Sequence, residues 1–168
     1  METVRKIFLN NLFKSDKGIT LVEIVIVIGL LAVLIGMAVP IYRTSYTKGD
    51  LDTSVSQVLS TIRLAQSKAM SGEGASKFGI HFDSSTTPYQ YVLFKGDVYN
   101  SVDPYNQVSK ISKQITITSL SFNGGGSDLV FEKYTGETNN SGTITLRNVS
   151  GETIDITINN IGATDVSY

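Results

Sequence analysis

The sequence of 168 residues contains no cysteine, so disulfides, thiolate metal sites and thiol nucleophiles are excluded together. Its single histidine, His81, falls on the expected outer face of a strand, and the pattern offers it no second ligand or nucleophile. The sequence also lacks a Ser-His-Asp set, a phosphate-binding glycine loop and a paired-acid motif. We therefore expect no catalytic site, no metal site and no cofactor, and we expect that the protein is not an enzyme.

One long apolar run stands out near the N-terminus. Ile24 to Ile41 supplies 18 residues, close to the roughly 20 that a helix needs to cross a bilayer. Glu23 lies at the start of this run, where an ionised carboxylate costs roughly 2 to 3 kcal/mol on membrane-insertion scales. We expect residues 19–41 to form a transmembrane helix in contact with membrane lipid, and we expect Glu23 to need a positively charged partner.

Charge is scarce, at 17% of the residues, and it is divided unevenly along the chain. Residues 1–18 carry four basic and two acidic side chains, a net charge of +2, which leaves −3 for the remainder because the total is −1. A positive flank stays on the cytoplasmic side of a membrane helix. The expected arrangement is a single-pass protein of the inner membrane, with a cytoplasmic N-terminus and a periplasmic or extracytoplasmic C-terminal head.

Two ordinary explanations of this front end remain open. A secretory signal peptide would be cut after small residues, and Gly36-Met37-Ala38 could serve as that cut. An uncleaved signal anchor would account for the length and the orientation of the apolar run. Neither explanation gives a reason for a glycine junction at Gly18 followed by Glu23.

The stretch Gly18-Ile19-Thr20-Leu21-Val22-Glu23, with Lys17 before it, resembles the processing motif of type IV prepilins and pseudopilins. The resemblance implies that residues 1–18 are a leader peptide, which prepilin peptidase removes by cutting between Gly18 and Ile19. It also implies that Ile19 becomes the N-methylated first residue of the mature protein. A glycine at the junction suits this role, because the absence of a side chain lets a protease approach the backbone closely.

The same resemblance gives roles to three residues further along. In the family, the carboxylate at the position of Glu23 is thought to pair with the new amine of a neighbouring subunit, which would fix the register of subunits in a filament. Pro40 lies where helices of the family commonly bend. Proline lacks an amide hydrogen and clashes with the preceding turn, and Gly36 loosens the same place, so we expect a kink there.

Residues 42–73 are expected to continue as an amphipathic helix, with apolar residues recurring at spacings of three and four. Gly49-Asp50 could break this helix, and Gly72 and Gly74 should end it. From residue 74 to residue 168 the period changes to two, which predicts a β-rich head domain. The expected fold class is α+β: a long N-terminal helix, transmembrane in its first half and amphipathic in its second, packed on an antiparallel β-sheet. The expected strands cover 77–83, 89–95, 115–122, 128–133, 143–148 and 153–158.

This order resembles the GspH/FimT-type minor pseudopilins and minor pilins, both in residues 59–83 and in the closing pair of strands. The resemblance implies a minor pseudopilin of a type II secretion system. Its partners would be prepilin peptidase, other pseudopilins or pilins, an inner-membrane platform protein and an assembly ATPase. One alternative is a minor subunit of a type IV or competence pilus, and another is a membrane-tethered β-domain binding module. We do not expect DNA as a partner, because the tail from Ile161 to Tyr168 holds Asp165 and no basic residue.

Overall fold

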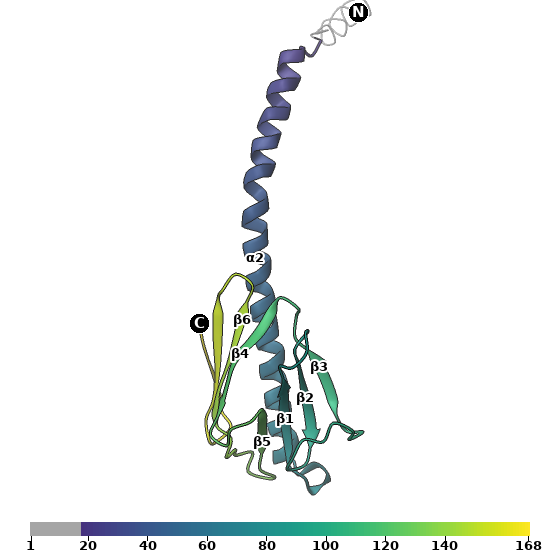
Figure 1. The fold of residues 1–168 in the computed structure, drawn as a ribbon, viewed down its shortest axis with the longest axis vertical. Helices are drawn as coiled ribbons and strands as arrows, with labels where there is room; N and C mark the ends of the chain where they lie inside the picture. Colours follow the sequence, from purple (N-terminus) through teal and green to yellow (C-terminus); the bar gives the residue numbers. More distant parts are fainter. Residues whose placement is uncertain (1–17) are drawn as a thin grey trace, which may run out of the picture. The chain divides into compact units, whose positions relative to one another are not determined.

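The computed structural model describes residues 18–168, with the backbone alone for residues 38–47. The chain divides into two compact units, Met1–Tyr42 and Arg43–Tyr168, called below the first unit and the second unit. The elements run from α2 (Leu21–Met70) through the short 3₁₀ helix η1 (Glu73–Ala75) to strands β1 to β8 (Figure 1). The expected leader, apart from its last residue Gly18, lies outside the described residues.

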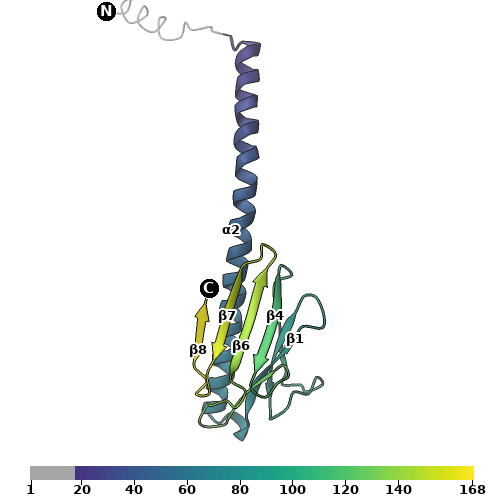
Figure 2. The same cartoon turned by 60° about the vertical axis from the view of Figure 1, so that its left-hand side comes forward.

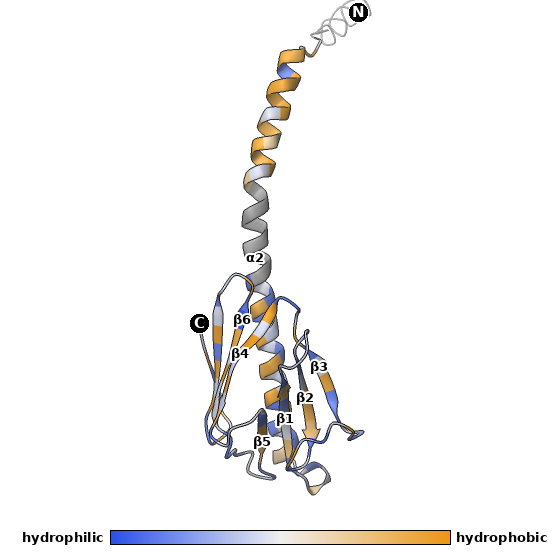
Figure 3. Ribbon diagram, in the orientation of Figure 1, coloured by the Kyte–Doolittle hydropathy of each residue, from blue (hydrophilic) through white to orange (hydrophobic). Residues whose placement is uncertain are grey.

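In the first unit, helix α2 carries large apolar side chains around its whole circumference (Figure 3). Between Ile19 and Met37 their exposed fractions run from 48% at Ile24 to 78% at Leu21. An uncovered apolar surface of this kind is normally buried against lipid or another protein.

Among the residues that the structure describes, no helix combines the length and the apolar character needed to cross a membrane.

In the second unit, helix α2 buries one face. The buried side chains share a spacing of three or four residues, as expected for an amphipathic helix. The helix runs without interruption through Gly49 and Asp50, so the break expected there is wrong. A glycine inside a helix costs only about 1 kcal/mol, which burial of the apolar face outweighs. The helix ends at Met70, and Gly72 then adopts a positive φ of 68°, close to the end expected from the sequence. The buried face consists of Leu51, Ser54, Val55, Val58, Ile62, Ala65 and Ala69.

The strands of the second unit form two antiparallel sheets, which confirms the α+β layout but not the single sheet that was expected. One sheet, called sheet A, has the order β3-β2-β1-β5, and the other, sheet B, has the order β4-β6-β7-β8 (Figures 1 and 2). The bounds in sheet A are β1 Phe78–Asp83, β2 Gln90–Lys95, β3 Gln107–Lys110 and β5 Asp128–Phe131. Those in sheet B are β4 Ile115–Phe122, β6 Gly142–Asn148, β7 Thr153–Ile158 and β8 Thr164–Ser167.

One apolar core joins the two sheets to the buried face of α2. Alternate residues of each central strand point into it, such as Ile144 and Leu146 of β6, both fully buried. In β4 a register shift between Ile117 and Ser119 changes which residues point inward. Such a bulge lets Ile115 and Ile117 on one side of it, and Phe122 on the other, all reach the core. Two sheets therefore share an interior that the expected single sheet would have left open on one side.

The outer face of sheet A is covered as well, by the segment that follows β2. Val92 and Phe94 are each only 1% exposed although they alternate with the core residues of β2. Tyr99 packs edge-on against Phe94 and stacks on His81, with ring centroids 4.1 Å apart in the second case. His81 also lies 2.6 Å from the Asp128 carboxylate, measured from Nδ1 to Oδ1. His81 is on the outer face as expected, but it is a packed residue and not a freely exposed one.

Candidate processing site at the start of helix α2

Helix α2 begins with a side-chain cap that the sequence analysis did not identify. The Oγ1 atom of Thr20 accepts a hydrogen bond from the backbone N–H of Glu23 at 3.2 Å. The backbone oxygen of Thr20 accepts from the N–H of Ile24, also at 3.2 Å, which is the first bond of the helical ladder. Thr20 is therefore the N-cap residue, and it satisfies one of the donors that a helix start leaves without a partner.

The expected cleavage junction lies directly before this cap. Gly18, Ile19 and Thr20 are exposed and have no helical or strand assignment. Ile19 is 71% exposed. No atom outside its immediate chain neighbours lies within 4 Å of the position that a Cβ on Gly18 would occupy. The Gly18–Ile19 peptide bond is therefore open to a large partner from several sides.

Glu23 lies in the first turn of α2 and is exposed. A carboxylate in a first turn faces the unpaired N–H groups of the helix start, and the helix dipole favours a negative charge there. This position also puts Glu23 within one turn of Ile19, so an amine created at Ile19 would lie near the carboxylate. The charge pairing with a neighbouring subunit remains a prediction.

The two residues expected to kink the helix lie further along α2. Gly36 is exposed, and a Cβ built on it would meet no atom within 4 Å. Pro40 belongs to the stretch whose side chains are not described. The backbone is helical at both positions, and the kink remains a prediction.

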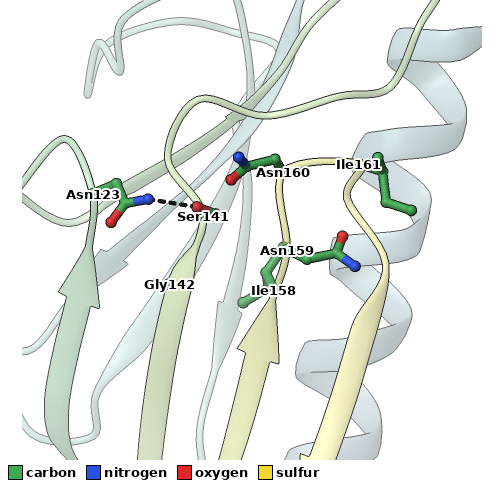
Figure 4. A pocket seen from close by; sticks show the side chains of 7 residues that line it. All are labelled: Asn123, Ser141, Gly142, Ile158, Asn159, Asn160 and Ile161. Carbon is green, nitrogen blue, oxygen red and sulfur yellow. Dashed lines mark hydrogen bonds between the residues drawn. The ribbon is translucent and has the colours of Figure 1, made fainter.

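A different kind of site is offered by a pocket in the second unit, lined mainly by amide and hydroxyl side chains (Figure 4). Asn123 donates from Nδ2 to Oγ of Ser141 at 2.7 Å across one edge of this pocket. Asn159 uses its Oδ1 to accept the backbone N–H of Ala163 at 2.8 Å. The lining residues carry no charge, so the pocket is suited at most to a neutral polar ligand. They are Asn123, Ser141, Gly142, Ile158, Asn159, Asn160 and Ile161.

An exposed glycine junction, a capped helix and an uncovered apolar surface are the features of a precursor that is cut and methylated at its N-terminus. Residues 13–39 match the family model of the prokaryotic N-terminal methylation motif. This match supports the type IV pilin-like or pseudopilin resemblance, and it indicates a membrane-anchored precursor that prepilin peptidase processes and that assembles with other pilins. Neither the comparison with curated proteins nor the comparison with solved structures returned a match.

The sequence held a signal for the one residue that was missed. Thr20-Leu21-Val22-Glu23 has the Thr-x-x-Glu spacing of a capping box, which marks a helix start just before an apolar run. Attention to Glu23 as a charge in an apolar stretch concealed its place as the third residue of the helix.

Proposed function

We propose that this protein is a minor pseudopilin of a type II secretion system, of the GspH/FimT type. The observation that carries the proposal is the arrangement at the start of α2: an open glycine junction, two residues ahead of a capped helix whose large apolar side chains are uncovered. A processing enzyme could reach the junction, and the apolar helix could then pass from lipid into a filament.

The proposed mechanism is assembly and not turnover of a substrate. The precursor sits in the inner membrane through residues 19–41, with its N-terminus in the cytoplasm and residues 74–168 outside. Prepilin peptidase cuts after Gly18, and Ile19 becomes a methylated, positively charged N-terminus. A platform protein in the inner membrane and a cytoplasmic ATPase then move the subunit into a periplasmic filament, while the protein itself performs no catalysis.

The electrostatic part of the mechanism concerns Glu23. When apolar helices pack side by side, an unpaired carboxylate among them is strongly unfavourable, whereas a carboxylate paired with an amine is tolerated. Pairing of Glu23 with the Ile19 amine of the next subunit would therefore favour one register over the others.

Glu23→Gln tests this mechanism, because it keeps the size of the side chain and removes its charge. We expect membrane insertion and cleavage to match the wild type, and incorporation into sheared filaments to fall by more than about tenfold. Asp52→Asn, on the same helix but in the second unit, is the matched control and should assemble normally. Normal incorporation of the Glu23→Gln protein would contradict the proposal.

Two alternative functions remain, each with its own outcome. If the protein is a minor pilus subunit, deletion of its gene should abolish pili or DNA uptake and leave protein secretion intact. If it is a membrane-tethered binding module, the neutral pocket around Asn123 and Ser141 would be its binding site. In that case the chain should keep residues 1–18 even in the presence of prepilin peptidase.

A further inference from the structure

We infer that Thr20 is a positioning residue for cleavage: its hydroxyl sets the start of helix α2 and thereby keeps the Gly18–Ile19 bond outside the helix. This inference rests on the proposed processing by prepilin peptidase. It concerns the conformation of the bond that is cut, and it is separate from the role of Glu23 in assembly.

The contacts at the helix start define where the regular backbone begins. Two hydrogen bonds converge on Thr20, one to its side chain from Glu23 and one to its carbonyl oxygen from Ile24. Residues 18–20 precede the helix and are exposed. The bond to be cut therefore lies one residue before the cap, where its carbonyl and amide groups are free to bind an enzyme.

The sequence offers a competing cap a few residues earlier. Ser15 and Asp16 are both residue types that cap helices well. A helix capped by Asp16 would have Lys17, Gly18 and Ile19 as its first three residues. The Gly18 carbonyl would then accept from the N–H of Val22, four residues on, and the bond to be cut would lie inside the first turn.

The hydroxyl of Thr20 favours the later start over the earlier one. Loss of a threonine cap typically weakens a helix start enough to change the ratio of two competing starts about fivefold. If only the non-helical junction is cut, the cleavage rate should follow that ratio. Glycine at position 18 helps in the same direction, since it is a poor residue for a helix interior.

The test uses the full-length precursor in membrane vesicles with purified prepilin peptidase, and it measures the initial rate of leader removal by gel shift and mass spectrometry. Thr20→Val keeps the shape of the side chain but removes the acceptor, and it should be cut about fivefold more slowly. Thr20→Ser retains the acceptor and should be cut within about twofold of the wild-type rate. Asp16→Ala added to Thr20→Val removes a competing cap and should restore most of the rate.

The outcomes separate this inference from the proposed function. If the wild-type precursor is not cut at all, the proposed processing itself fails. If the wild type and Thr20→Val are cut at equal rates, processing stands and the role of Thr20 is overturned. Equal slowing by Thr20→Val and Thr20→Ser would point to a steric effect and would also overturn it, as would a double variant that stays as slow as Thr20→Val.

Discussion

Helix α2 carries apolar side chains in both units, but their surroundings are opposite. From Ile19 to Met37 the large apolar side chains are at least 48% exposed, whereas Leu51, Val58 and Ile62 further along are at most 2% exposed. The pattern differs in the same way, since the first stretch is apolar on all sides and the second has one apolar stripe (Figure 3). An all-round apolar helix needs an apolar environment from outside the chain, whereas a striped helix can be satisfied by its own fold.

This difference separates the tasks of the two stretches. The second stretch stabilises the β sheets through the core that it shares with them. The first stretch contributes nothing comparable within the described chain, so its apolar character serves contacts with lipid or with other subunits. Substitutions in the two stretches should therefore affect different measurements.

The largest expected effect is that of Ile62→Ala, a truncation in the centre of the buried stripe. Ile62 is fully buried, so its loss should lower the free energy of unfolding of the second unit by roughly 2 to 5 kcal/mol. Urea unfolding of the full chain in detergent micelles, followed by tyrosine fluorescence, measures this change.

Two controls sharpen the comparison. Leu64→Ala, on the exposed side of the same stretch at 43% exposure, should change the unfolding free energy by no more than about 0.5 kcal/mol. Leu30→Ala, 61% exposed in the first unit, should leave unfolding unchanged and reduce filament incorporation instead. Equal destabilisation by Leu30→Ala and Ile62→Ala would break the distinction.

A somewhat smaller effect is expected from a pair of glycines, one in each unit. A Cβ on Gly142 would lie 1.9 Å from the backbone oxygen of Ser121, which cannot move without disturbing the pairing of β4 and β6. Gly142→Ala should therefore destabilise the second unit by about 1 to 3 kcal/mol. A Cβ on Gly29 would meet nothing within 4 Å, so Gly29→Ala should leave the thermal unfolding of the second unit unchanged. A matching drop in Tm for both variants would contradict this contrast.

The smallest expected effect concerns charge in the second unit. Hydrogen bonds from Ser85, through its hydroxyl and its backbone N–H, and from the amide of Gln90 hold the pKa of Asp83 below its ordinary value of 3.8. Because the pKa is lower in the folded state, this stabilisation is present above pH 3.8 and is lost as the pH falls through the folded-state pKa.

Asp83→Asn should therefore reduce stability at neutral pH, and its difference from the wild type should shrink as the pH falls below 3.8. Urea unfolding at a series of pH values gives the difference. Since apolar burial dominates the second unit, this loss should be well below that of Ile62→Ala. A difference that stays constant with pH would remove the charge from the explanation.

How far the sequence predicted the fold depended on burial. The strands β1, β2, β4, β5, β6 and β7 were all expected, because an apolar side chain at every second position marks a half-buried strand. The strands β3 and β8 were missed. Each has four residues at the edge of a sheet and a single valine, so hydrogen bonds to a neighbour hold it in place and leave no pattern of burial.

The division into two sheets could not be read from local patterns. It depends on β5 pairing with β1 across nearly fifty residues, and on the segment after β2 covering Val92 and Phe94. Both are tertiary contacts that no short window contains. At the processing site, the junction and Glu23 followed from the motif, and the Thr20 cap was present as a spacing that went unused.

The most direct test of the account is the intact mass and N-terminal sequence of the protein isolated from cells with and without prepilin peptidase. With the peptidase, the account predicts loss of residues 1–18 and a first residue, Ile19, that is heavier by one methyl group; without it, the full precursor should remain. A protein that still begins at Met1 when the peptidase is present, or one cut after Ala38, would contradict the account.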